Sequence, residues 1–578
     1  MRWQLLTADQ ATVARLISEA NLSPIVARLV AIRGVHTGED AARYLQPSLA
    51  HLHSPYEMLG MAAAVERLRA AIERKEKVLI YGDYDVDGTT AIVILKTAIE
   101  ICGGTADFHV PHRIREGYGM KDDVIEGAAD AGVRLIISVD TGIRAFAAAE
   151  TAHRLGLDLI VTDHHLPQAD GVPRALAVLN PNQAGCAYPC KALCGAGVAF
   201  KLVQALLAHA GRERLLPSFL KMVAIATIAD AVPLVGENRV IARVGLDGLR
   251  SAVNPGLKAL VEFAGLDPAR RVTASDVAFR IAPRINAAGR MDIAQTVVEL
   301  FCTREEARAR ELAQKLHQLN ADRQDEERRI MADIEARIEA DPALREAFCM
   351  VVDGDGWHRG VIGIAATRVV EQHGRPAIVV TREGEEAHGS GRSIPAFHLL
   401  DSLESCAHLF TRYGGHAHAV GFALPADRIP ELRAALDGLA RQRLTVADFE
   451  QVQEIDAEVT LDQITPEFYS ALEQLQPFGM DNRAPVFLAR SVKVVEPPRV
   501  LKDEHLKLRV FHRGGPQGGR ALDALGWWMA ERLQPEPLLA GDLLDIGFTV
   551  ERNSNPEFAG LQLNLCDFRR PAAATATT

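Results

Sequence analysis

Short runs of apolar, mostly β-branched residues alternate with helical segments in the first third of the chain, and this alternation restricts the fold more than any other feature. The runs occupy residues 78–82, 106–110, 133–140, 157–165 and 175–180. Strands separated by helices run parallel, because each helix carries the chain back across the sheet. The pattern therefore predicts an α/β domain built on a parallel sheet.

Acidic residues and histidines stand at the ends of three of these runs and of one apolar helix. They are Asp83, Asp85 and Asp87 after the first run, Asp140 at the end of the third, Asp163, His164 and His165 at the end of the fourth, and Asp230 at the end of the helix. The carboxyl ends of parallel strands meet at one edge of the sheet, where open α/β sheets bind ligands. A single aspartate there would more simply be a helix cap or a turn residue. A whole set at one edge is harder to explain in that way.

The composition of this set predicts a metal site. Crowded carboxylates repel one another unless a cation neutralises them. Carboxylates mixed with one or two histidines favour Mn²⁺ or Mg²⁺, whereas zinc prefers histidine and cysteine. Two ions about 3.5–4 Å apart, bridged by a shared carboxylate, are the usual arrangement for phosphoester hydrolysis. We therefore expect two divalent ions at this edge.

The rest of the chain divides by its periodicity. Apolar residues recur every three or four positions within 303–340, which predicts one long amphipathic helix, or two in series, joining two domains. Strand–helix alternation resumes after Pro342, and short strands between Gly/Pro turns follow from residue 450. The expected divisions are a helical N-terminal segment (1–50), the parallel-sheet domain (51–250), a helical region with the long helix (251–345), a smaller α/β domain (346–446), a β-barrel (450–568) and a disordered tail (569–578).

Composition narrows the class of protein. The 578 residues carry a net charge of −11, which argues against a purely charge-driven grip on nucleic acid but leaves room for a local basic groove. No stretch approaches the ~18 apolar residues of a membrane span, and the N-terminus lacks a signal-peptide pattern, so we expect a cytoplasmic protein with no membrane partner. Cys186, Cys190 and Cys194 could form a zinc site, but their spacing favours buried or loop cysteines.

Four segments, in this order, resemble the motifs of the DHH family of phosphoesterases: GDYDVDG (82–88), SVDTG (138–142), TDHH (162–165) and ATIADAVPL (226–234). The resemblance implies that the metal ligands and catalytic groups are Asp85, Asp87, Asp140, His164 and Asp230, with Asp83, Asp163 and His165 as further metal candidates. Asp163 is expected to orient His164, and His165 to bind a metal or the phosphate during catalysis. Many members have a histidine where Tyr81 stands, and Asp83 is expected to compensate for it.

Two later segments, GSGRS (389–393) and RYGGHAHAVGF (412–422), are similar to the DHHA1 domain, which binds substrate. The residue types agree, because glycine-rich backbone can form an anion-binding nest, arginine can grip phosphate in bidentate fashion and serine can donate a hydrogen bond. A tight turn is the plainer interpretation. The candidate substrate-binding residues are Ser390, Gly391, Arg392, Gly414, Gly415 and His416. His416 is either a catalytic residue that contacts the scissile phosphate or leaving group, or a structural histidine.

Three segments resemble the RecJ-type members in particular: VPHRIREGYG (110–119), FRIAPRINAAGRMD (279–292) and QPFGMDNRAPVF (476–487), the last leading into an oligonucleotide-binding (OB) barrel. They make Arg113, Arg280, Arg284 and Arg290 candidates for backbone phosphates or a 5′ phosphate, with surface ion pairs as the alternative. Phe487, Phe511, Trp527 and Trp528 either stack on bases or belong to the core.

The resemblance implies a multidomain α/β protein that is a metal-dependent 5′→3′ exonuclease. It would degrade single-stranded DNA to nucleoside 5′-monophosphates in recombination and repair, as a monomer, with a single-stranded-DNA-binding protein and a RecQ-type helicase as candidate partners. One alternative is a phosphodiesterase of short oligonucleotides, cyclic dinucleotides or pyrophosphate, against which the barrel argues. Another is a non-catalytic RecJ-like nucleic-acid-binding module, against which the intact acidic motifs argue.

Overall fold

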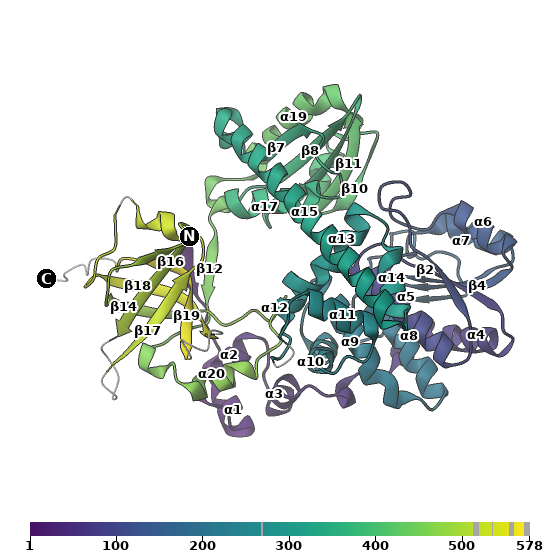
Figure 1. Cartoon of the computed structure of the whole chain (residues 1–578), viewed down its shortest axis with the longest axis horizontal. Helices are drawn as coiled ribbons and strands as arrows, with labels where there is room; N and C mark the ends of the chain where they lie inside the picture. Colours follow the sequence, from purple (N-terminus) through teal and green to yellow (C-terminus); the bar gives the residue numbers. More distant parts are fainter. Residues whose placement is uncertain (268–269, 513–518, 535, 554–559, 572–578) are drawn as a thin grey trace. The chain divides into compact units, whose positions relative to one another are not determined.

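The computed structural model describes residues 1–267, 270–512, 519–534, 536–553 and 560–571, and it contains two compact units (Figure 1). One unit comprises His53–Val232 and Val244–Gln451, and the other comprises Met1–Leu52, Pro233–Arg243 and the chain from Val452 onwards. Most of the predicted disordered tail lies outside the described residues. No helix among the described residues is both long and apolar enough to cross a membrane.

The larger unit begins with a five-stranded parallel sheet in the order β3-β2-β4-β5-β6. Its strands are β2 (Lys77–Tyr81), β3 (Ala106–His109), β4 (Val133–Val139), β5 (Asp158–Thr162) and β6 (Ala177–Leu179). Each coincides with one of the five apolar runs, so the predicted parallel sheet is confirmed. The sheet positions the site because the carboxyl ends of β2, β4 and β5 are neighbours.

Helices connect these strands and extend the domain. They are α4 (Met61–Glu73), α5 (Val86–Ile101), α6 (Asp122–Asp130), α7 (Phe146–Arg154), α8 (Gly195–His209) and α9 (Leu216–Ala229). Helix α5 is apolar around most of its circumference because it packs against both α8 and α9. Asp85 caps α5 by accepting a hydrogen bond from the Gly88 amide at 3.0 Å.

A helical region follows the sheet. It comprises α10 (Gly236–Leu249), α11 (Pro255–Phe263), α12 (Ala274–Asp276), a π-helical turn (Val277–Ile281), α13 (Ala282–Met291), α14 (Gln295–Cys302), α15 (Glu306–Ala340) and α16 (Pro342–Glu346). Helix α15 is one continuous helix of 35 residues, roughly 52 Å long. It packs first on α11, α13 and α14 and then continues to the next domain (Figure 1). Its last apolar residues, Ile330, Ile334 and Ile338, are part of the core of that domain.

That next domain holds a mixed sheet in the order β10-β11-β9-β8-β7. Its elements are β7 (Met350–Asp355), α17 (Ile362–His373), β8 (Ala377–Glu383), β9 (Glu386–Arg392), α18 (Leu399–Glu404), β10 (Arg412–His416), β11 (Ala419–Pro425) and α19 (Ile429–Arg443). Strands β7 and β8 are parallel and the others antiparallel. The smaller α/β domain is confirmed.

Most residues of the glycine-rich segments of this domain lie in strands β9, β10 and β11. Strand β9 pairs on both sides, with β8 and β11, which uses the backbone amides that a nest would offer to a ligand. Gly389 is needed for packing, because a Cβ there would lie 2.1 Å from the ring of Phe422.

The smaller unit contains the predicted barrel. Its strands are β13 (Ala457–Glu458), β14 (Phe487–Val494), β15 (Arg499–Leu501), β16 (His505–His512), β17 (Arg520–Gly526), β18 (Leu543–Arg552) and β19 (Leu561–Arg569). The barrel closes because β14 pairs with both β18 and β16. Five strands in the closed order β14-β16-β17-β19-β18 form an OB-like barrel.

The N-terminal segment packs against this barrel. It contains α1 (Gln10–Ala20), α2 (Pro24–Ile32), α3 (Gly38–Leu45) and a strand that the sequence pattern did not predict, β1 (Arg2–Leu5), which pairs with β12 (Val452–Ile455). Leu16, Leu29 and Val30 are buried in one core with the barrel interior and α20 (Pro466–Glu473). A helical lead-in is therefore part of the C-terminal unit.

Candidate metal centre and phosphate pocket

The structure gathers the predicted acidic set at one edge of the parallel sheet. Three groups of ligand atoms each lie within 4.8 Å of one another: Asp83, Asp85 and Asp140; Asp87, His164 and Asp230; and Asp140, His164 and His165. Asp140 and His164 each belong to two groups. A shared carboxylate between neighbouring groups is the arrangement that two divalent ions require.

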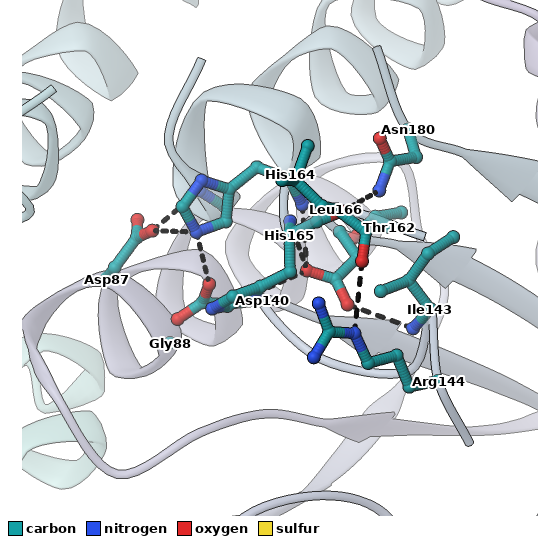
Figure 2. A network of polar contacts seen from close by, with 12 residues as sticks. Asp87, Gly88, Asp140, Ile143, Arg144, Thr162, His164, His165, Leu166 and Asn180 are labelled. Carbon is teal, nitrogen blue, oxygen red and sulfur yellow. Dashed lines mark hydrogen bonds and ion pairs between the residues drawn. The ribbon is translucent and has the colours of Figure 1, made fainter. Parts of the chain in front are cut away.

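His164 lies among three carboxylates. Its Nε2 is 3.3 Å from Asp140 Oδ1, 3.8 Å from Asp230 Oδ2 and 3.9 Å from Asp87 Oδ2. Figure 2 shows the imidazole between Asp87, in the first turn of α5, and Asp140, which directly follows β4. Burial lowers the pKa of His164, so the ring is neutral near pH 7 and able to donate a lone pair to a metal.

The N-terminus of α8 holds Asp87 in place. Asp87 Oδ2 accepts a hydrogen bond from the Gly195 amide at 2.6 Å, and Oδ1 accepts one from the Ala196 amide at 2.7 Å. The positive end of a helix dipole stabilises such a carboxylate. Residue 195 must be glycine here, because a Cβ would lie 2.5 Å from the side chain of Asp140. The sequence signals this support only through the two glycines, Gly195 and Gly197, at the start of α8.

Asp83 and Asp140 each carry an orphaned oxygen. Both side chains are buried, and in the described part of the chain their Oδ1 atoms accept no hydrogen bond, although His164 Nε2 lies 3.3 Å from that of Asp140. Asp140 also adopts a left-handed φ of 58°. Leaving a buried polar atom unpaired costs free energy, and strained backbone is typical of functional sites. A divalent cation would satisfy both oxygens, so the residues fit a metal centre.

The metal-free carboxylates bind protons. Burial and then neighbouring aspartates raise the pKa of Asp83 and Asp140 well above the ordinary value. Burial, with Asp87 and Asp85, raises the pKa of Asp230 to about 9. Burial also raises the pKa of Asp87, although His164 opposes this. A bound cation would reverse this preference and displace the protons.

Asp163 behaves differently from the other aspartates. Burial alone would raise its pKa, but its hydrogen bonds lower it below the ordinary value. Asp163 Oδ2 accepts from the Ile143 amide, and Oδ1 accepts from the His164 and His165 amides and contacts His165 Nδ1 at 2.7 Å (Figure 2). The prediction that Asp163 orients His164 is therefore wrong, since its side chain orients His165. Among the described residues, the three ligand groups do not include Asp163.

His165 and Tyr81 complete the surroundings of the carboxylates. Burial would lower the pKa of His165, but its contact with Asp163 raises it. The Asn180 side chain donates to the His165 carbonyl at 2.9 Å, which fixes the loop. Tyr81 is buried with its hydroxyl on the Gly119 carbonyl at 3.2 Å, whereas Asp83 joins a ligand group.

Three of the candidate arginines and one serine converge beside the metal centre, in what we call the phosphate pocket: Arg113, Arg290, Arg392 and Ser390. Arg113 lies 4.8 Å over the ring of Tyr84, and Arg290 Nη1 donates to the Gly360 carbonyl at 2.9 Å. Arg392 Nη1 is 3.3 Å from Ser390 Oγ.

The electrostatics of this pocket favour a bound anion. Burial, followed by repulsion from Arg113 and Arg392, lowers the pKa of Arg290 to about 9. Burial and Arg113 lower the pKa of Arg392. Within the described ranges, no carboxylate forms an ion pair with any of the three guanidinium groups. Like charges held together without a counter-charge favour a bound anion, and guanidinium groups suit phosphate.

The other two arginines have structural partners. Arg280 donates to the carbonyls of Ala264 at 3.1 Å and Gly265 at 2.5 Å, and pairs with Asp276. Arg284 donates to the Arg280 carbonyl and approaches His317 Nδ1 at 3.3 Å. The structure does not bring these two arginines into the phosphate pocket.

Gly391, Gly414, Gly415 and His416 of the DHHA1-like segments lie on different strands of the sheet: the first on β9 and the others on β10. Gly391 is buried, and a Cβ there would lie 2.7 Å from Leu399. Gly414 and Gly415 lie in β10, an exposed edge strand; residue 415 has φ 143°, and a Cβ would lie 2.2 Å from the Ala419 carbonyl. His416 ends that strand, and its pKa is lowered by burial, then by His418, Arg392 and His165. The charges of Arg392 and His165 therefore act on the His416 ring.

The candidate cysteines and aromatic residues differ in how far they are buried. Cys194 is buried at the start of α8, where its Sγ accepts from the Gly197 amide, and the ligand groups among the described residues include no cysteine. Phe487 is in the barrel core and Phe511 is partly buried. Trp527 is 45% and Trp528 73% exposed.

The chain is similar to known proteins over nearly its whole length. Three family models match it: the DHH family N-terminal domain over residues 77–227, the DHHA1 domain over 346–442 and the RecJ OB domain over 455–567. It is 38% identical, over 88% of its length, to the single-stranded-DNA-specific exonuclease RecJ of Bacillus subtilis (strain 168), and 35% identical, over 89%, to that of Dickeya dadantii (strain 3937). It spans 64% of the Bacillus protein and 91% of the Dickeya protein.

The fold is also similar to a solved structure. A crystal structure of RecJ in complex with Mn²⁺ from Thermus thermophilus matches with a TM-score of 0.84 and 28% identity, over 99% of this chain and 80% of that one. The Mg²⁺ complex of the same protein matches with a TM-score of 0.79. The similarity therefore extends across both units.

Proposed function

The chain belongs to the RecJ family, and from this we propose that it is a metal-dependent exonuclease that degrades single-stranded DNA 5′→3′ to nucleoside 5′-monophosphates in recombination and repair. The observation that carries the proposal is the convergence of five aspartates and two histidines on overlapping ligand groups beside an unpaired arginine pocket. Neither feature alone would distinguish an exonuclease from a metal-binding protein.

The metal ligands in this proposal are Asp83, Asp85, Asp87, Asp140, His164 and Asp230, holding two Mn²⁺ or Mg²⁺ ions. The orphaned oxygens of Asp83 and Asp140 support it, and the oxygen-rich donor set suits these ions better than zinc. When bound, the two ions would lower the pKa of a water and offset the charge of the phosphate. His165 stands beside Asp140 as a further ligand or phosphate contact.

Hydrolysis would break the bond between the terminal nucleotide's 3′ oxygen and the next phosphorus. Water supplies a hydroxyl to that phosphorus and a proton to the 3′ oxygen. The lowered pKa of His416 keeps its ring neutral near pH 7, so its proposed role is to donate a hydrogen bond to the phosphate. The chain's own contribution is to bind and orient the strand.

The phosphate pocket would set the polarity. A 5′-terminal phosphate held by Arg113, Arg290 and Arg392, with Ser390 donating a hydrogen bond, offsets the repulsion among the three guanidinium groups. Because the pocket adjoins the metal centre, a strand anchored by its 5′ phosphate would present its first internucleotide bond to the metals. Removal of one nucleotide at a time follows from that anchoring.

The barrel would hold the strand farther from its end. The exposed Trp527 and Trp528 cluster with the half-buried His505, and their ring centroids lie 4.9 Å and 5.3 Å from its ring. His505 begins β16, and the tryptophans directly follow β17. These are the second and third strands of the barrel, the usual oligonucleotide-binding face of an OB fold. Aromatic rings stack on bases without sequence preference.

Digestion of a labelled single strand tests the proposal. We expect Mn²⁺-dependent release of nucleoside 5′-monophosphates from a 3′-labelled strand, loss of activity in EDTA, and unimpaired activity when the 3′ end is blocked. A 5′ block should stop the reaction. Preference for a dinucleotide over a long strand would instead favour the phosphodiesterase of small substrates, and Mn²⁺ binding without turnover on any substrate would favour the non-catalytic module.

The remaining parts of the proposal concern the cell. We propose a cytoplasmic monomer that acts with a single-stranded-DNA-binding protein and a RecQ-type helicase. Sedimentation of the purified chain with and without each protein tests this, since a monomer that gains mass with neither would contradict both partners.

A further inference from the structure

A basic cleft extends from the phosphate pocket along the second domain. Its volume is about 730 Å³, and its walls are the segment 113–121 and the sheet of β9, β10 and β11. The cationic side chains that line it are Arg113, Arg115, Lys121, Arg359 and Arg412. Among the described residues, its lining includes none of the proposed metal ligands. One lining residue, Tyr118, donates its hydroxyl to the Asp140 carbonyl at 3.2 Å, so the cleft starts beside the metal centre and continues over the sheet of the second domain.

The register of the sheet orders the floor of this cleft. Three rows of residues share one face: His416, Ala419 and Arg392; then Gly414, Gly421 and Ser390; then Arg412, Ala423 and His388. Successive rows are two residues apart, roughly 7 Å, so the third row begins roughly 13 Å beyond Arg392. The middle row carries no large side chain, which leaves a hollow between Arg392 and Arg412.

The cleft holds more positive charge than a single phosphate needs. The carboxylate in its lining, Glu116, accepts from the His112 amide at 2.8 Å and contacts His109 at 3.0 Å within its own loop. Arg359 lies 3.7 Å from Glu383. In the described part of the chain, Arg115, Lys121 and Arg412 form no ion pair. These charges are additional to the arginines of the phosphate pocket.

A second cleft could hold the nucleotides of the strand beyond the scissile bond, apart from the basic cleft. Its volume is about 710 Å³, and it is lined by Ala229 and Ala231 on either side of Asp230, by Arg290, and by Phe279, which is 76% exposed. It borders the metal centre directly. If the nucleotides beyond the scissile bond occupy this second cleft, the basic cleft is left for groups attached to the 5′ terminus.

We propose that the basic cleft is a subsite for the extra phosphates of a 5′-di- or triphosphorylated strand. The inference rests on the proposed function, since it takes the phosphate pocket as the site of the first phosphate. Arg359 and Arg412 would contact the outer phosphates across the glycine hollow. The hydrolysed bond is unchanged, and the anhydride bonds stay intact, so the first product is a nucleoside 5′-triphosphate.

The experiment compares three strands of one sequence, labelled in every nucleotide, with a 5′ hydroxyl, monophosphate or triphosphate, on the full chain with Mn²⁺. We expect the triphosphate strand to be degraded at a rate similar to the monophosphate strand, with a nucleoside triphosphate released first. The double variant Arg359→Ala/Arg412→Ala should reduce kcat/KM for the triphosphate strand about 10- to 100-fold, because hydrogen bonds to charged groups are lost. Its action on the monophosphate strand should stay within about 2-fold.

Control variants distinguish a failure of the triphosphate subsite from a failure of the proposed exonuclease function. Arg428→Ala/Arg441→Ala removes two arginines of α19 and its N-terminus that pair with Glu431 and Asp437, and should change none of the rates. Without cleavage, inorganic triphosphate in EDTA should raise the melting temperature of the parent chain more than that of the Arg359/Arg412 variant. Rejection of triphosphate ends by a chain active on monophosphate ends would overturn the subsite alone, as would equal slowing of all strands by the double variant. Inactivity on every strand would overturn the proposed function itself.

Discussion

The edge of the parallel sheet and the outer face of the barrel are built on opposite principles. At the sheet edge, buried aspartates face one another with unpaired oxygens and raised pKa values. On the barrel, Trp527 and Trp528 are exposed beside Lys507 and Arg509, which pair with Asp523 at 2.9 Å and 3.7 Å. The sheet edge needs a bound cation to satisfy its carboxylates, whereas the charged groups on the barrel already pair with one another. Single changes should therefore abolish function at the sheet edge and only weaken it on the barrel.

The largest expected effect is at Asp140. Asp140→Asn removes a charge shared by two ligand groups, so we expect cleavage to fall at least about 1,000-fold while binding of single-stranded DNA persists. The same change should leave the melting temperature in EDTA equal or higher, because a buried asparagine is neutral without having to bind a proton. Turnover close to that of the parent chain would remove Asp140 from the catalytic centre.

Metal binding should depend strongly on pH. The pKa of Asp230 is about 9 in the folded chain, and those of Asp83 and Asp140 are also raised, whereas unfolded aspartates titrate near pH 4. Between about pH 4 and 9 the metal-free folded state binds more protons than the unfolded state, so its free energy of unfolding falls as pH rises. A cation displaces those protons.

The affinity for Mn²⁺ should then rise about 10-fold per pH unit for each displaced proton. Melting curves in EDTA and in MnCl₂ at pH 6, 7 and 8 measure this as a stabilisation by metal that grows with pH. If Mn²⁺ raised the melting temperature equally at all three pH values, the carboxylates of the metal-free chain would already be ionised. The sheet edge would then titrate like exposed polar groups.

Arg392→Ala should have an intermediate effect. Loss of one guanidinium from the phosphate pocket should lower kcat/KM for 5′-phosphorylated strands about 10- to 100-fold and leave 5′-hydroxyl strands nearly unchanged. The free energy of unfolding should change little, because the remaining arginines repel each other less. Arg280→Ala is the matched control, since Arg280 caps carbonyls outside the pocket. Equal rates on both kinds of end would contradict the phosphate role.

The smallest expected effect is on the barrel. Trp527→Ala/Trp528→Ala should weaken binding of a long single strand about 10-fold, since base stacking contributes ~1–3 kcal/mol per base. Cleavage of a dinucleotide should be unaffected. In the parent chain a bound strand should quench fluorescence, because the other two tryptophans, Trp3 and Trp357, are partly or fully buried. Leu539→Ala, at another exposed apolar residue of this unit, is the control, and an equal loss there would argue against stacking.

Local sequence patterns determined the architecture and the members of the metal centre. Apolar runs specify strands, and parallel strands must end at a common edge, so the residues after β2, β4 and β5 could be expected to meet. Five of the predicted aspartates and both predicted histidines indeed fall within the ligand groups. The long helix α15 and the closed barrel also followed from periodicity.

Tertiary structure alone decided how those side chains are supported and which arginines face the site. Asp87 depends on the amides of Gly195 and Ala196, more than a hundred residues away. The Asp163 carboxylate contacts the imidazole of His165, whereas it accepts only from the backbone amide of His164. Arg290 is buried toward the pocket while Arg280, on the preceding π-helical turn, caps carbonyls. The type of a residue indicates what its side chain can bind. Its actual partner depends on packing between segments that are distant in the chain, and a local sequence pattern carries no information about that packing.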